Sequence, residues 1–141
     1  MSHVDLAAIP QVALPFMNDD HVEEGRLLNA AIDATKAHVG GKVPVESVLH
    51  GYEALLQHTQ EHFGREEEAM RRAGFPAYAV HKGEHDRVVD EMEAEETHFR
   101  ETGDTKRLLA YLSEAVPAWF VAHIQSMDTV TAQFVTMRGG G

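Results

Sequence analysis

The sequence predicts an all-α protein, an antiparallel up-down-up-down four-helix bundle preceded by an extended N-terminal arm. Two observations favour this fold. Apolar residues recur every three or four positions through four long segments, and glycines and prolines separate those segments by short connections. The alternation of apolar and polar residues that is typical of strands does not occur. Helices joined by short connections pack as antiparallel neighbours, which defines the topology of the bundle.

The first helix follows an arm that covers residues 1 to about 18 and contains two prolines without a sustained period. The Asn-Asp-Asp run at 18–20 is expected to cap this helix, because such side chains accept hydrogen bonds from the free amides of a first turn. Glu23 and Glu24 then fall in the opening turn, where the helix dipole favours acids. The helix is predicted to end near Val39, before a pair of glycines.

The second and third helices are bounded by the same two residue types. Pro44 suits the first turn of the second helix, which is predicted to run to about Arg72 and to stop at Gly74. Pro76 opens the third helix, which is expected to end near Gly103.

The fourth helix is expected to begin at a cap formed by Asp104 or Thr105 and to continue to about Met137. Pro117 lies inside it and removes a backbone donor. Because the apolar face continues past this proline, we expect a bend there rather than the end of the helix.

Composition sets limits on the class of protein. A chain of 141 residues is about one domain, here divided into the arm, a bundle at 19–137 and a flexible tail at 138–141. It has no cysteine, so any metal must be held by histidine and carboxylate. The net charge of −11 argues against nucleic acid and anionic membranes as partners. The first residues lack the basic segment of a secretory signal and no apolar run approaches the ~20 residues of a membrane span, which favours a cytoplasmic protein.

The positions of the histidines indicate a metal centre. At about 100° per residue, all four core-facing stripes carry imidazole, and one of them also carries a carboxylate. A single buried histidine is often an ordinary core residue. Several imidazoles and a carboxylate in one apolar core, however, each require a hydrogen-bond partner, and a shared metal satisfies all of them. The residues concerned are His21, His62, Glu66, His81, His85 and His123.

The α-helical period does not place one further acid, Asp128, on a core-facing stripe. Asp128 follows His123 by five residues, which places it about 140° away around an α-helix. Without other information, a solvated aspartate is the simpler interpretation.

The motifs taken together resemble a known family. An isolated histidine in MNDDHVEE is followed by HFGREEEAM, FPAYAVHKGEH and WFVAHIQSMD, one motif in each predicted helix. This ordered set is similar to that of the hemerythrins, particularly the bacterial hemerythrin-like (HHE) proteins. The resemblance covers nearly the whole chain.

The resemblance implies a non-haem di-iron centre, with two iron ions bridged by two carboxylates and an oxo or hydroxo group. It assigns His81, His85 and His123 to one iron, His21 and His62 to the other, and Glu66 and Asp128 as bridges. These ligands leave one position open, where dioxygen would bind reversibly, so the protein is expected to carry, store or deliver oxygen and not to be an enzyme. Reversibility requires an apolar pocket. The candidates for its lining are Phe63, Trp119, Phe120 and Ile124.

Two other residues near the motifs have open roles. His58 precedes His62 by one helical turn and is expected at the rim, as a ligand-supporting or proton-relay group or as a plain surface residue. Glu24 could reach the open iron position and block it, although a first-turn helix acid is the simpler role.

Three alternative functions remain. The first is a di-iron redox enzyme, such as an oxidase, a peroxidase or a nitric-oxide-reacting enzyme. The second is an oxygen or iron sensor. The third is a zinc protease, because HTQEH at 58–62 and HKGEH at 81–85 match the His-x-x-Glu-His pattern. The protease interpretation leaves His21, His123 and Glu66 unexplained, and a histidine-rich ligand set favours reversible binding over oxygen activation.

Overall fold

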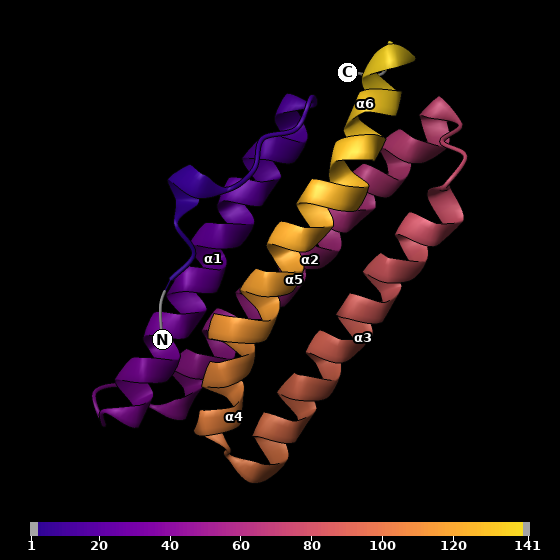
Figure 1. Ribbon diagram of the computed structural model, residues 1–141. Coiled ribbons are helices and arrows are strands. Elements are labelled where there is room, and N and C mark those ends of the chain that lie inside the picture. The colour runs from indigo at the N-terminus through magenta and orange to yellow at the C-terminus, as the bar shows by residue number, and fades with distance from the viewer. Residues whose placement is uncertain (1–2, 140–141) are drawn as a thin grey trace.

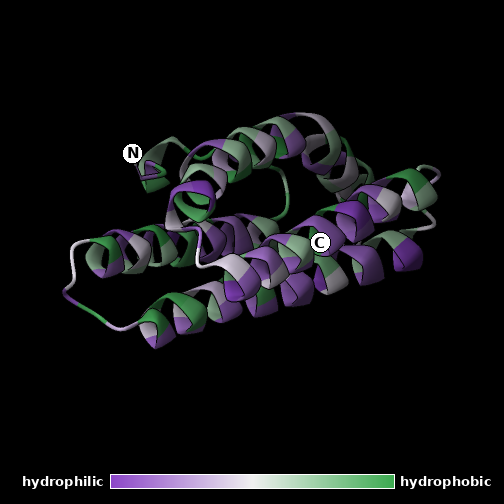
Figure 2. Cartoon of the chain, turned by 90° about the horizontal axis from the view of Figure 1, so that it is seen from below, coloured by the Kyte–Doolittle hydropathy of each residue, from purple (hydrophilic) through white to green (hydrophobic). Residues whose placement is uncertain are grey.

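The computed structural model describes residues 3–139 and confirms the predicted all-helical four-helix bundle (Figure 1). Among those residues there is no strand, and none of the helices is long and apolar enough to cross a membrane. Every helix carries both hydrophobic and hydrophilic residues around its axis (Figure 2). This amphipathic pattern is expected for helices that bury one face in the core and expose the other to solvent.

Helix α1, Pro15–Val39, begins earlier than the sequence suggested. Pro15 occupies its first turn, where the missing N–H costs nothing because that amide has no helical partner. The predicted caps at 18–20 therefore lie inside the helix. The N-cap position is occupied instead by Leu14, whose backbone is extended. Asn18 uses its side chain for another purpose, the attachment of the arm.

Helices α2, Val45–Ala73, and α3, Tyr78–Thr102, end as predicted. Gly74 and Gly103 follow them with φ angles of 69° and 68°, the left-handed conformation that closes a helix and that glycine adopts without a Cβ clash. Pro76 lies in the connection, two residues before α3 begins.

The fourth helix is continuous through Pro117, as expected. It contains two π-helical turns, in which the backbone bonds i to i+5, and the first of them ends just before the proline. The wider turn makes room for the proline ring, which otherwise crowds the carbonyl four residues earlier. Its successive parts are α4 (Thr105–Ala110), η2 (Tyr111–Ala115), α5 (Val116–His123), η3 (Ile124–Asp128) and α6 (Thr129–Met137).

Of the predicted tail at 138–141, Arg138 and Gly139 form a turn after α6. Residues 140–141 lie outside the described part of the chain.

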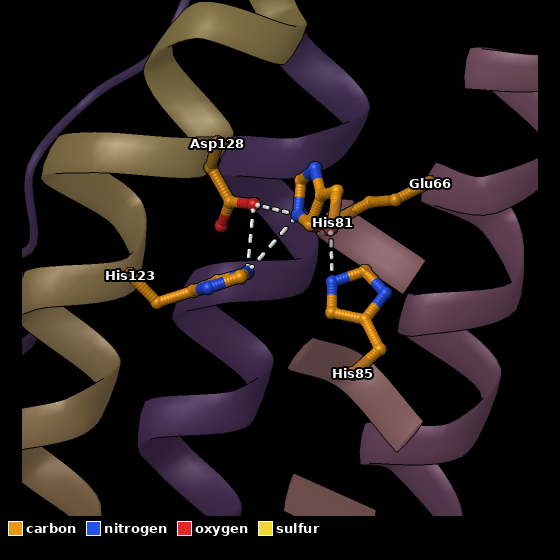
Figure 3. Close-up of side chains that lie close together, drawn as sticks. All are labelled: Glu66, His81, His85, His123 and Asp128. Atoms are coloured by element: carbon orange, nitrogen blue, oxygen red, sulfur yellow. Dashed lines mark hydrogen bonds and ion pairs between the residues drawn. The ribbon is translucent and has the colours of Figure 1, made fainter. Parts of the chain in front are cut away.

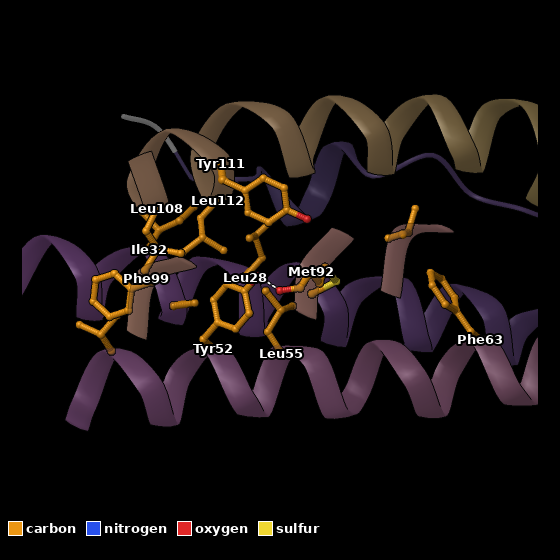
Figure 4. Packing of buried hydrophobic residues seen from close by; sticks show 13 residues of the cluster. Leu28, Ile32, Tyr52, Leu55, Phe63, Met92, Phe99, Leu108, Tyr111 and Leu112 are labelled. Carbon is orange, nitrogen blue, oxygen red and sulfur yellow. Dashed lines mark hydrogen bonds between the residues drawn. The ribbon is translucent and has the colours of Figure 1, made fainter. Parts of the chain in front are cut away.

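The main hydrophobic core fills one half of the bundle (Figure 4). Leucine, isoleucine and aromatic side chains from all four helices are buried there. The hydroxyl of Tyr52 donates to the Met92 carbonyl at 2.6 Å, which ties α2 to α3. This half of the molecule holds the helices together mainly by apolar packing.

The N-terminal arm packs back along α1 (Figure 1). It contains a short 3₁₀ turn, η1 (Leu6–Ala8), and its Ile9 is buried against the fourth helix. Gly25 allows this close approach, because a Cβ there would lie 2.7 Å from Cδ2 of Leu6. Two asparagines of α1 fasten the arm. Asn29 both accepts from the Val4 amide at 2.7 Å and donates to its carbonyl at 2.9 Å, and Asn18 does the same to Val12 at 2.8 Å and 2.9 Å.

The substitution Asn29→Ala tests this attachment. Two hydrogen bonds of ~1 kcal/mol each are lost, and the higher helix propensity of alanine offsets ~0.6 kcal/mol of this loss, so the free energy of unfolding should fall by about 1.4 kcal/mol. Denaturant unfolding measures this change, and amide exchange should become faster around Val4. Asn18→Ala is the matched control, in which exchange should increase around Val12 instead. Equal exchange at Val4 in the unmodified protein and in Asn29→Ala would show that the asparagine does not hold the arm.

Candidate metal centre

The seven residues that the sequence singled out lie together in the half of the bundle beyond the hydrophobic core. All are buried, with exposed fractions between 0% and 5%. Figure 3 shows five of them turned toward one another from α2, α3 and the fourth helix. The contributing residues are His21 from α1, His62 and Glu66 from α2, His81 and His85 from α3, His123 from α5 and Asp128 from η3.

A π turn brings Asp128 to the centre. The Thr129 amide donates to the Ile124 carbonyl, five residues earlier, so this turn takes more residues than an α turn. Residue i+5 therefore returns to the face of residue i, and Oδ1 of Asp128 lies 3.2 Å from Nε2 of His123. The α-helical period placed this acid on another face, and the structure corrects that placement.

Glu66 has imidazoles on both sides. Its Oε1 lies 3.3 Å from Nε2 of His85 and 3.8 Å from Nε2 of His81. Its Oε2 lies 3.6 Å from Nε2 of His21 and 3.6 Å from Nε2 of His62. One oxygen thus faces the α3 histidines and the other faces the histidines of α1 and α2.

Asp128 repeats this division. Its Oδ1 lies 3.1 Å from Nε2 of His81 and close to His123, whereas its Oδ2 lies 3.0 Å from Nε2 of His21. The two carboxylates therefore separate the five imidazoles into a group of three and a group of two, and each presents an oxygen to both groups.

Most of the atoms that face the centre lack hydrogen-bond partners within the protein, although Nε2 of His81 and Nε2 of His123 lie 3.1 Å apart. Despite their close approaches, both oxygens of Glu66, both oxygens of Asp128 and Nε2 of His21 and His85 make no hydrogen bond of acceptable geometry. Leaving several buried charged or polar atoms unpaired costs several kcal/mol for each charge. A cation among these atoms removes that cost, and imidazole with carboxylate is a donor set that suits iron. The arrangement of these residues therefore supports a metal-binding site.

The charges of the centre agree with this conclusion. Burial lowers the pKa of His21, but the neighbouring carboxylates of Asp128 and Glu66 outweigh burial and raise this pKa to about 9. Burial raises the pKa of Asp128, but the imidazoles of His123, His21 and His81 outweigh it and lower this pKa well below its usual value. Without metal, the acids stay ionised and His21 carries a proton at neutral pH, which an incoming metal ion displaces.

Outer contacts turn three of the rings so that Nε2 points inward. In each case Nδ1 lies within hydrogen-bond distance of an oxygen of a neighbouring side chain, an arrangement that orients metal-binding histidines. Sequence reasoning did not single out two of these partners, Glu67 and Thr131, because only the tertiary structure places them beside the rings. The pairs are His81 with Thr131 at 2.8 Å, His85 with Glu67 at 3.0 Å and His62 with Glu24 at 3.1 Å.

Aromatic side chains stack on two of the histidine rings. Phe63 stacks on His85, with ring centroids 3.8 Å apart and planes 2° apart. Trp119 stacks on His123 at 4.5 Å and 18°, and its indole N–H donates to Glu84 at 2.7 Å. These contacts restrict the rotation of both imidazoles.

The other two predicted lining residues lie on the α1 side of the centre. Phe120 meets His21 edge-on at a centroid distance of 5.8 Å, and it packs with Ile124 and with Ile9 of the arm. All four predicted lining residues therefore surround the cluster with apolar surface, whereas their contact with a bound ligand stays a prediction.

Glu24 differs from its predicted role as a first-turn acid. Because α1 begins at Pro15, Glu24 lies in the third turn, and it is buried with 6% of its surface exposed. It contacts Nδ1 of His62 and also Nδ1 of His58, which is partly buried as the sequence suggested.

Comparison with known proteins agrees with this geometry. The sequence profile described as "Hemerythrin HHE cation binding domain" matches residues 12–135. A protein of Aquifex aeolicus named bacteriohemerythrin is 31% identical over 125 residues, covering 89% of this chain and 92% of that protein. Another bacteriohemerythrin, of Ralstonia nicotianae, is 29% identical over 120 residues, covering 85% of this chain and 80% of that protein.

A solved structure of a hemerythrin mutant has the same fold, with a TM-score of 0.74 at 23% identity over 96% of this chain and 97% of that one. The profile match spans most of the chain, and it includes every residue of the metal-binding cluster. This chain belongs to the hemerythrin family.

Proposed function

We propose that the centre holds two iron ions and binds dioxygen reversibly. The observation that carries this proposal is the division of five imidazoles into three and two by carboxylates that face both groups. A single metal ion would not require two carboxylates that each direct one oxygen to either group of histidines. Two ions bridged by both carboxylates use every donor.

In this proposal each residue has a distinct role. Three histidines would hold one iron and two would hold the other, and both carboxylates would be shared by the pair, together with an oxo or hydroxo group. The iron pair, when bound, supplies electrons to dioxygen and recovers them on release. Counting donors leaves one position open, on the iron with fewer imidazoles. The residues are His81, His85 and His123 for the first iron, His21 and His62 for the second, and Glu66 and Asp128 as bridges.

The surrounding side chains would keep water and protons away from the open position. Phe63, Trp119, Phe120 and Ile124 supply apolar surface around the cluster. A dry pocket of this kind favours release of dioxygen over irreversible oxidation of the metal. We further propose that residues 1–141 act as one such domain, a carrier or store of oxygen.

The test is anaerobic loading of metal-free protein with ferrous iron. We expect two irons per chain by metal analysis and a visible charge-transfer band that appears in air and disappears on degassing, over repeated cycles. Irreversible oxidation with release of hydrogen peroxide would replace this proposal with a di-iron oxidase. A preference for zinc, or one metal per chain, would contradict the two-iron centre itself.

A second prediction concerns the N-terminal half of α3. Up to Val88 this helix buries only His81 and His85, and clefts of about 480 Å³ and 240 Å³ flank it on the sides of α2 and of the fourth helix. Removal of the metal should therefore loosen residues 78–88, whereas 92–102 stay held by Tyr52 and the hydrophobic core.

Hydrogen exchange measures this difference. With free metal at about 100 times its Kd, protection of residues 78–88 should rise by up to about 100-fold over the metal-free protein. His50→Ala, an exposed histidine on α2, is the control and should leave the metal-dependent protection unchanged. Equal protection of 78–88 with and without metal would contradict the prediction.

A further inference from the structure

A second cluster of metal-ligating side chains lies beside the centre, between α1 and α2. Its members are Glu24, His58 and His62, whose donor atoms lie within 4.8 Å of one another. Glu24 is buried, and the His58 side chain is 11% exposed. The cluster therefore lies between the solvent and the pair of histidines at the inner site.

The distances within the cluster suit a metal ion. Oε1 of Glu24 lies 3.1 Å from Nδ1 of His58 and 3.1 Å from Nδ1 of His62. Adjacent corners of an octahedron with metal–ligand bonds of about 2.1–2.2 Å are separated by about 3 Å. Two histidines and one carboxylate on one face of the ion form a common ferrous-iron site. Without metal, the same distances fit hydrogen bonds that both rings donate to the carboxylate, and an arriving cation displaces those protons.

The orientation of His62 connects this cluster to the centre. Its Nδ1 faces Glu24, whereas its Nε2 faces Glu66 at 3.6 Å. A neutral imidazole has one lone pair for a metal, so the ring serves one ion at a time. The outer position is therefore suited to temporary occupancy before the inner position is filled.

The chain also offers a route from the surface. Oδ1 of Asp20, whose side chain is 14% exposed, lies 3.7 Å from the other ring nitrogen of His58, and Arg65 holds this aspartate with two hydrogen bonds of 2.8 and 2.9 Å. The Thr59 hydroxyl contacts the second oxygen of Glu24. Donor atoms thus run from Asp20 through His58 and Glu24 to His62.

We propose that Glu24, His58 and His62 form a metal-capture site, which binds a ferrous ion entering from the solvent and passes it to the centre through His62. This proposal rests on the two-iron centre proposed above. On the opposite side, Nδ1 of His85 meets Glu67 alone, and the described residues include no comparable outer triad there. Iron therefore enters from the side of the two-histidine group.

The decisive variant is His58→Ala, because His58 belongs to the capture site and not to the seven residues of the centre. A route through the capture site predicts that iron uptake by the metal-free protein and iron removal by a chelator both slow by about the same factor, about tenfold. The final content of two irons and the equilibrium affinity should stay unchanged, since a route changes rates and not the end states. Both rates are measured anaerobically by quenched metal analysis, with His50→Ala as the exposed-histidine control.

The outcomes separate the possible roles. Weaker iron affinity with an unchanged uptake rate would mean that His58 only supports the orientation of His62 through Glu24, and would overturn the capture site. Unchanged uptake and removal would overturn it as well. If the unmodified protein itself fails to take up two irons, the proposed function fails first. Glu24→Gln provides a second variant, which should slow uptake because an amide is a weaker iron ligand than a carboxylate.

Discussion

The structure depends on one electrostatic constraint, the burial of two carboxylates and five imidazoles inside the bundle. Such groups are costly in an apolar interior unless each finds a partner, and the protein alone leaves many of their atoms unpaired. A cation at their centre is the partner that all of them share. This requirement explains why polar residues occupy inward positions on all four helices, where an ordinary bundle has leucine.

The rest of the fold satisfies this constraint because the main apolar core and the polar cluster occupy different parts of the bundle. A hydrophobic core around Leu28, Tyr52 and Leu112 holds the helices on one side of the polar cluster, and a smaller one around Met17 and Val135 packs beyond it. Continuous helices connect these parts, and they position histidines four residues apart on one face. Helix α3 shows the limit of this arrangement, because its first half is attached mainly through His81 and His85. We therefore expect metal binding and local stability to be coupled in that segment.

The two sides of the centre differ in their outer contacts. On the α3 side, Phe63 stacks on His85 and Glu67 contacts its Nδ1, so these two residues orient a single ring. On the α1 side, a buried Glu24 contacts both His58 and His62. On this second side the polar contacts continue from Glu24 through His58 to Asp20, whereas on the α3 side they end at Glu67. The inner cluster is nearly symmetric about its carboxylates, but its surroundings are not, and that asymmetry gives the two groups of histidines different environments.

The sequence by itself determined the helical fold, the ends of α2 and α3 at their glycines, and six of the seven residues of the cluster, because these depend on helical periodicity and local backbone chemistry. Asp128 could be proposed only through a family resemblance, since the π turn that returns it to the face of His123 has no simple sequence pattern. The early start of α1 moved Glu24 from an expected helix end to a buried contact with His62. Only the tertiary structure decided which neighbours orient each ring, because those contacts join residues that are far apart along the chain.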